Sequence, residues 1–173
     1  MLTKKKLNQL KKNIKLVVFD FDGVFTDNRV LTLEDGTEGV FCNRSDGFGI
    51  SLLKKNNIHY VVISKERNPV VSVRCAKLKI PCIQCVDDKL AVLKEKSAQW
   101  SIPLEQIAYL GNDINDVECL KAVGLPAVVA DAYPPISKYA KYITKTPGGF
   151  GAVREFCDFL LGESYVSKLK KRI

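Results

Sequence analysis

Two aspartates stand one residue apart where an apolar run ends. The sequence LVVFDFDG carries Asp20 and Asp22, with Gly23 directly after them. A short apolar run bounded by polar residues is typical of a strand buried on both faces of a sheet, expected here at about 16–21. An unpaired buried carboxylate is costly, so the two acids favour the ligand-binding edge of an open parallel sheet.

The spacing of these two acids indicates phosphoryl chemistry. Side chains alternate along a strand, so Asp20 and Asp22 can point into one cavity. Such hard oxygen ligands suit Mg²⁺, which commonly works beside a substrate phosphate. One carboxylate could attack phosphorus while the other moves protons, and Gly23 would allow a tight turn beside the ligand. On these residues alone, two solvated acids that merely end a strand remain an equal alternative.

Polar residues also follow two other apolar strands. The strand expected at 59–64 ends at Ser64, and the strand at 107–110 leads into an acidic loop with Asp113 and Asp116. Alternating strands and helices predict one parallel sheet with helices on both faces, a Rossmann-like, doubly wound α/β fold. Three polar clusters at three strand ends would share one edge of that sheet, which is more specific than any cluster alone.

Periodicity and turn residues predict the remaining elements. One helix is expected to open at Asp46 as its N-cap and to end at Asn56, and another is expected to follow Asn68 and Pro69. The other expected helices lie at about 4–13, from 88 onward, 116–123, 134–139 and 152–161, and the other expected strands at 81–86, 127–130 and 142–144.

Residues 28–43 interrupt the expected step from strand to helix. Two short apolar stretches flank Asp35-Gly36, which predicts a projecting β-hairpin. Apolar residues on a projecting hairpin need cover, so this segment is a candidate for packing against another subunit. The alternative is that it folds back on its own domain.

The bulk properties indicate a single domain over residues 1–173. The chain is 46% hydrophobic and 27% charged, which is ordinary for a globular protein. Neither a secretory signal nor a membrane-spanning run is recognisable, so the expected location is the cytoplasm. The six cysteines are expected to be reduced, and a metal or redox role for the Cys82/Cys85 pair is a minor alternative.

The net charge of +8 raises the possibility of nucleic-acid binding. Much of the positive charge lies at the two ends, in lysines 4–12 and in the basic tail 168–172. Interleaved aromatic residues, which single-strand binding surfaces carry, are missing there. Solvated basic termini are therefore the preferred interpretation, and no nucleic-acid or membrane partner is expected.

The motifs in order resemble one enzyme family. DFDGVFTD, Ser64 closing VVIS, DDKLAVLK with Lys89, GNDINDVECL and GGFGAVREF are similar to the haloacid dehalogenase-type phosphatases. The similarity covers about residues 14–161. It is strongest to the small branch without a large cap, which holds 3-deoxy-manno-octulosonate 8-phosphate phosphatase and the C-terminal domain of CMP-sialic acid synthetases.

The resemblance implies a role for each matching residue. Asp20 would be the nucleophile that forms an aspartyl-phosphate, and Asp22 would protonate the leaving sugar oxygen and then activate water. Ser64 and Lys89 would hold the phosphoryl group. Mg²⁺ would be held by Asp20, the backbone carbonyl of Asp22 and the acidic loop. For Lys89, a surface helix lysine is the alternative.

Two positions depart from the family pattern. Relatives often have Gly-Asp-Asp where this chain has Gly111-Asn112-Asp113. Asn112 would then bind the metal through a neutral amide oxygen, with Asp113 and Asp116 close by, which would weaken Mg²⁺ binding. Phe150 stands where relatives often carry an arginine, so this loop is not expected to bind a substrate carboxylate.

The branch also implies an assembly and a substrate class. Its members form tetramers in which neighbouring hairpins close each other's active sites, which would explain residues 28–43. Asn43 and Arg74, with Lys65 or Arg67, match positions near the sugar. For Arg74, a solvated helix face is the alternative.

Three hypotheses about function follow. The preferred one is a Mg²⁺-dependent phosphatase acting on a 2-keto-3-deoxy sugar acid phosphate, either octulosonate 8-phosphate or a nonulosonate 9-phosphate. A broad-specificity small-molecule phosphatase is the second. A non-catalytic oligomerisation module, like some synthetase C-terminal domains, is the third.

Overall fold

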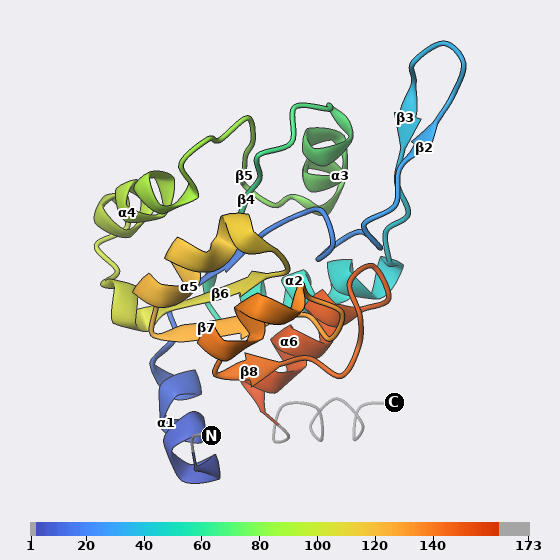
Figure 1. The fold of residues 1–173 in the computed structure, drawn as a ribbon. Helices are drawn as coiled ribbons and strands as arrows, with labels where there is room; N and C mark the ends of the chain where they lie inside the picture. The colour runs from blue at the N-terminus through green and yellow to red at the C-terminus, as the bar shows by residue number, and fades with distance from the viewer. Residues whose placement is uncertain (1–2, 163–173) are drawn as a thin grey trace.

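The computed structural model describes residues 3–162 as a sheet of six parallel strands flanked by helices (Figure 1). The strand order is β5-β4-β1-β6-β7-β8. The strands are β1 (Leu16–Phe19), β4 (His59–Ile63), β5 (Cys82–Ile83), β6 (Ile107–Gly111), β7 (Leu125–Val128) and β8 (Tyr142–Ile143). The predicted doubly wound α/β fold is confirmed, and no large cap is present in the described part of the chain.

The helices are α1 (Lys4–Asn13), α2 (Arg44–Lys55), α3 (Val70–Leu78), α4 (Lys89–Gln99), α5 (Val117–Ala122) and α6 (Ala152–Leu161). Helix α2 packs closely against α6, and α4 packs against α5. Because parallel strands are joined by right-handed crossovers, these two pairs cover opposite faces of the sheet. Short 3₁₀ turns at Leu104–Gln106, Ile114–Asp116 and Pro134–Tyr139 complete the connections.

The core is built from the central strands, which bury every residue that they contain. All four residues of β1 and all five of β6 are buried, as their continuous apolar sequences require. Strand β1 pairs with β4 on one side and with β6 on the other. The strand order reverses between β1 and β6, so the ends of these two strands form the switch point at which open α/β sheets bind ligands.

The predicted hairpin is present and projects from the body of the domain (Figure 1). Strands β2 (Leu31–Thr32) and β3 (Glu38–Gly39) pair antiparallel. The turn lies where the sequence places it, with Gly36 in a left-handed conformation at φ 81°.

The prediction that Asp46 caps α2 is wrong. The helix begins at Arg44, and the side chain of Asn43 accepts a hydrogen bond from the Ser45 amide at 2.9 Å. Asp46 is fully buried in the first turn, where it accepts a hydrogen bond from the Arg154 amide at 3.0 Å. Asn and Asp are equally good caps, and the tertiary contact with α6 decided between the two.

Several strand boundaries also differ from expectation. The strand expected at 81–86 is confined to Cys82–Ile83, because Cys85 takes a left-handed conformation at φ 61° that ends the extended run. The strand expected at 127–130 is Leu125–Val128, and it includes Pro126, which lies opposite Tyr109 of β6. The basic tail 168–172 lies outside the described residues. No helix within residues 3–162 combines the length and the apolar character that crossing a membrane requires.

Candidate active site

A cleft of about 500 Å³ opens at the carboxyl ends of the central strands. Five predicted site residues line it, and they come from the ends of three neighbouring strands. Those five are Asp20, Asp22, Ser64, Asn112 and Asp113. The predicted convergence of polar residues at one sheet edge is therefore present in the fold.

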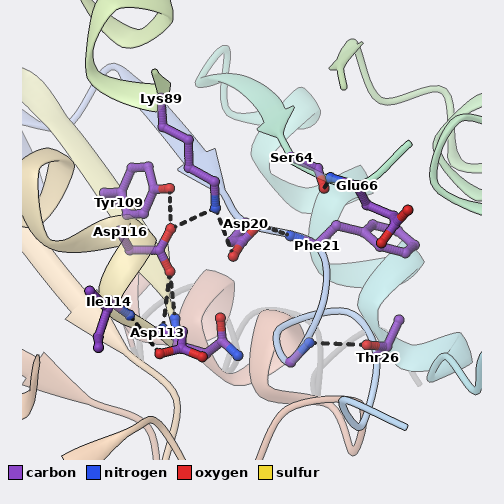
Figure 2. Close-up of polar contacts among 12 residues, drawn as sticks. Asp20, Phe21, Thr26, Ser64, Glu66, Lys89, Tyr109, Asp113, Ile114 and Asp116 are labelled. Carbon is purple, nitrogen blue, oxygen red and sulfur yellow. Dashed lines mark hydrogen bonds and ion pairs between the residues drawn. The ribbon is translucent and has the colours of Figure 1, made fainter. Parts of the chain in front are cut away.

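Lys89 and Asp116 lie behind this lining, where Lys89 contacts both the predicted nucleophile and Asp116 (Figure 2). The Lys89 ammonium lies 2.8 Å from Asp20 Oδ2 and 2.8 Å from Asp116 Oδ1. The side chain of Lys89 is only 2% exposed, so it is not a surface helix lysine. It enters from the first turn of α4, next to the N-cap Asp88.

Asp116 is saturated by donors from this chain. Its Oδ1 atom accepts hydrogen bonds from the Tyr109 hydroxyl at 2.6 Å and from Lys89. Its Oδ2 atom accepts from the amides of Asn112 at 2.8 Å and Asp113 at 3.3 Å. These contacts suit a carboxylate that positions Lys89 and the acidic loop.

Burial controls the charges of the central pair. Burial and the Asp116 carboxylate raise the pKa of Asp20 to about 7, against the lowering effect of Lys89. Burial alone would lower the pKa of Lys89, but Asp20 and Asp116 outweigh it and raise that pKa. Lys89 is therefore a permanent cation beside the Asp20 carboxyl.

Asp22 stands at the cleft in a different environment. Burial and the nearby Glu66 carboxylate raise the pKa of Asp22 to about 6. An acid in this range can both give and take a proton near neutral pH. The electrostatics of Asp20 thus suit a nucleophile held by a cation. Those of Asp22 suit a group that gives and takes protons.

The turn that carries the two aspartates is fixed by local contacts. The Gly23 amide donates to Thr26 Oγ1 at 3.0 Å, and the Gly149 amide donates to the Val24 carbonyl at 3.1 Å. Gly23 has φ 73°, and a Cβ built there would lie 1.9 Å from Asn112 Nδ2. Only glycine lets the turn approach the acidic loop this closely.

Ser64 follows β4 and is buried at the wall of the cleft. Its backbone amide donates to the Ile83 carbonyl at 2.9 Å, and its Oγ accepts from the Glu66 amide at 3.1 Å. The hydroxyl hydrogen has no acceptor within residues 3–162, so it is available to a bound anion.

Asn43 and Arg74 lie together but do not line the cleft. Arg74 donates through Nη2 to the backbone carbonyl of Asn43 at 3.0 Å, and its buried Nε has no partner in the described chain. Arg74 is thus partly buried and does not lie on a solvated helix face. The predicted roles of both residues in binding sugar have no support from the cleft of this chain.

Sequence reasoning missed several residues of the site. Tyr109 holds Asp116, and the one available signal was a tyrosine in an otherwise aliphatic buried strand, because a buried hydroxyl needs a partner. Arg29 lines the mouth of the cleft, as do Asn28, Val30 and Asn115, whereas Lys65 and Arg67, which also line it, were expected from the family resemblance. Nothing local in the sequence distinguishes these four exposed residues from others on the surface.

Comparison with known proteins places this geometry in a family. Residues 83–156 match the model of the haloacid dehalogenase-like hydrolases. The chain is 37% identical to 3-deoxy-D-manno-octulosonate 8-phosphate phosphatase of Salmonella typhi, over 87% of this chain and 80% of that enzyme. The chain belongs to the haloacid dehalogenase-like hydrolases. It is a phosphoric monoester hydrolase, and the predicted family is confirmed.

Solved structures agree with this assignment. A probable phosphatase from Pseudomonas syringae is 37% identical and has a TM-score of 0.92, covering 98% of this chain and 99% of that one. The 3-deoxy-D-manno-octulosonate 8-phosphate phosphatase of Moraxella catarrhalis is 29% identical and also has a TM-score of 0.92, covering 99% and 100%. The latter structure holds a magnesium ion, a phosphate ion and the octulosonate sugar.

Substituting Gly23 by Ala should disable the site. The new Cβ must displace Asn112 and adopt a left-handed conformation, which together should lower activity by about 100-fold. Phosphate release from p-nitrophenyl phosphate measures this effect.

Gly36→Ala is the matched control. Gly36 has φ 81°, and a Cβ built there has no atom within 4 Å. Alanine at this position should therefore add only backbone strain, which should lower the free energy of unfolding by about 1–2 kcal/mol. Urea denaturation measures that change. Equal activity in the two variants would show that the close approach of Gly23 to Asn112 does not matter.

Proposed function

We propose that this chain hydrolyses 3-deoxy-D-manno-octulosonate 8-phosphate to the free sugar acid and phosphate. The observation that carries the proposal is the buried cluster behind the polar cleft, in which Lys89 forms ion pairs with both Asp20 and Asp116. Relatives of the chain are phosphatases for this ester. A nonulosonate 9-phosphate stays a candidate substrate of the same chemical class. A non-catalytic module gains no support, because Asp20, Asp22, Ser64 and Lys89 are all in place.

The reaction proceeds through an intermediate on Asp20. The Asp20 carboxylate attacks phosphorus, the bond between phosphorus and the ester oxygen breaks, and Asp22 gives its proton to the leaving sugar oxygen. A water that Asp22 deprotonates then attacks phosphorus, which releases phosphate and restores Asp20. The elevated pKa of Asp22, about 6, supports both proton transfers.

Ser64 and Lys89 hold the transferring phosphoryl group. The Ser64 hydroxyl donates to one of its oxygens, and the Lys89 ammonium stabilises the charge that develops on them. Asp116 keeps Lys89 in place. The saturated contacts of Asp116 favour this role over direct metal binding.

The cofactor is Mg²⁺, which neutralises phosphoryl charge when bound. The donors that fit it are the carboxylates of Asp20 and Asp113, the amide oxygen of Asn112 and the backbone carbonyl of Asp22. Within residues 3–162 no three His, Cys, Asp or Glu side chains gather closely enough to form a metal site by themselves. Waters and the substrate phosphate must therefore complete the coordination, as Mg²⁺ usually requires.

The sugar acid carries a carboxylate that needs a cation. Arg29, Lys65 and Arg67 line the mouth of the cleft. Arg29 is already paired with the Asp27 carboxylate at 2.6 Å, so Lys65 and Arg67 supply the cation. Asn43 and Arg74 lie outside the lining, which favours Lys65 and Arg67, the other two positions that the family resemblance implies. A planar guanidinium also matches a carboxylate with two parallel hydrogen bonds.

The hairpin supports assembly into a homotetramer whose hairpins cover neighbouring sites. Its apolar side chains are exposed in the single chain, with Leu31 54% and Phe41 65% accessible. A projecting strand pair with such residues is a protein interaction surface. The proposed location is the cytoplasm, with neither nucleic acid nor membrane as partner.

The substrate proposal is tested by phosphate release from a panel of sugar phosphates. Octulosonate 8-phosphate should be hydrolysed with the highest kcat/KM, ahead of a nonulosonate 9-phosphate and of p-nitrophenyl phosphate. Asp20→Asn and removal of Mg²⁺ with EDTA should each abolish turnover. A higher kcat/KM on the nonulosonate ester would overturn the substrate, and activity in Asp20→Asn would overturn the mechanism.

Asn112→Asp should tighten Mg²⁺ binding. The change replaces a neutral amide oxygen by a charged carboxylate at a position where Gly23 leaves room. The Mg²⁺ concentration for half-maximal activity should fall by about tenfold. Asn115→Asp, which adds the same charge to the neighbouring cleft wall, is the control, and an equal shift in both variants would mean that only the local field changed.

Lysine substitutions at Leu31 and Phe41 should dissociate the assembly, because they bury charge in an apolar contact. Sedimentation velocity should show a smaller species than the unmodified protein. Val73→Lys, at an equally exposed valine on α3 (66% accessible), is the control and should leave the assembly unchanged. A monomeric unmodified protein would refute the tetramer without affecting the catalytic proposal.

A further inference from the structure

A second cavity, of about 360 Å³, lies away from the active-site cleft, where β4 starts and three helices end. His59 and Tyr60 open strand β4, Lys54 is in the last turn of α2, and Lys79 and Trp100 are the C-caps of α3 and α4. The volume falls within the range of small-ligand pockets, about 300–1,000 Å³. Because β4 carries Ser64 at its other end, the two cavities lie at opposite edges of the sheet.

The side chains give this cavity a positive charge, set against the partial negative charge of the three helix ends around it. Two lysines line it, and no acidic side chain does. Neither Lys54 nor Lys79 takes part in an ion pair within residues 3–162. A lysine in the last turn of a helix complements the helix dipole, which accounts for Lys54 in α2.

Lys79 needs another explanation, because its backbone is left-handed at φ 57°. Glycine is the usual residue in that conformation at the end of a helix, since a Cβ is strained there. The chain instead keeps a long cationic side chain at this position, on the wall of the cavity. Strain retained beside a cavity is a reason to look for a function.

The aromatic residues fit a planar group. The rings of His59 and Trp100 stack with centroids 5.4 Å apart and planes 22° apart. The Tyr60 hydroxyl has no hydrogen-bond partner in the described part of the chain. Aromatic faces beside unpaired lysines are how proteins bind a base and its phosphate together.

We propose that this cavity binds a nucleoside monophosphate, with the phosphate between Lys54 and Lys79 and the base against the His59–Trp100 pair. The proposal concerns a site separate from the catalytic cleft and does not depend on the proposed substrate.

Trp100 makes the test selective, because it is the only tryptophan of the chain. Adenosine monophosphate is titrated into the intact protein with EDTA present, so that the ester is not hydrolysed, and tryptophan fluorescence is recorded. A saturable change is expected, while adenosine and inorganic phosphate alone should each bind at least about tenfold more weakly. No saturable change with adenosine monophosphate would overturn the proposal.

The matched variants are Lys79→Gly, Lys54→Ala and Lys55→Ala. Lys79→Gly relieves the backbone strain, so its melting temperature should be at least that of the unmodified protein while its affinity falls about tenfold. Lys54→Ala should weaken binding similarly, and Lys55→Ala, which removes the same charge outside the cavity, should not. Unchanged affinity in Lys79→Gly, or equal losses in all three variants, would refute a built site.

Discussion

The buried contact of one ammonium with two carboxylates governs the rest of the structure. Lys89 is held between Asp20 and Asp116, and all three side chains are at most 5% exposed. Removing one partner of such a group leaves an uncompensated buried charge, typically at a cost of about 3–5 kcal/mol. The remaining capacity of Asp116 is filled by Tyr109 and two backbone amides, so the cluster is rigid. That rigidity positions Asp20, the proposed nucleophile, before any substrate arrives.

This constraint explains residues that otherwise look unrelated. Lys89 reaches the centre from the first turn of α4, and Tyr109 reaches Asp116 because the turn after β6 folds back on the end of that strand. Gly111 is required by the same cluster, since a Cβ there would lie 2.4 Å from Asp116 Oδ2. The switch point of the sheet thus provides more than an open crevice. It brings the ends of β1 and β6 close enough for Asp20 and Asp116 to contact the same Lys89 ammonium.

The sequence predicted the parts of this arrangement that depend on local pattern. Continuous apolar runs located the central strands, and the acids after them located the edge of the sheet at which they meet. The sequence could not predict that Asp116 contacts Lys89 while Asp113 lines the cleft. This difference depends on which of the two carboxylates the fold surrounds with hydrogen-bond donors. The cap of α2 was misassigned for the same kind of reason: Asn43 and Asp46 are equivalent as local signals, and only the contact with Arg154 separates them.

The two proposed catalytic carboxylates depend on their surroundings to different degrees. Asp20 obtains its environment entirely from this chain, because burial and Asp116 set its pKa while Lys89 opposes them. Asp22 lies at the wall of an open cleft and is affected by Glu66, whose segment 65–67 also lines the mouth. Covering that mouth would desolvate Asp22 further and raise its pKa, while leaving Asp20 almost unchanged. The environment of the proposed nucleophile, Asp20, is therefore set by the fold, whereas the pKa of the proposed acid–base group, Asp22, responds to whatever closes the cleft.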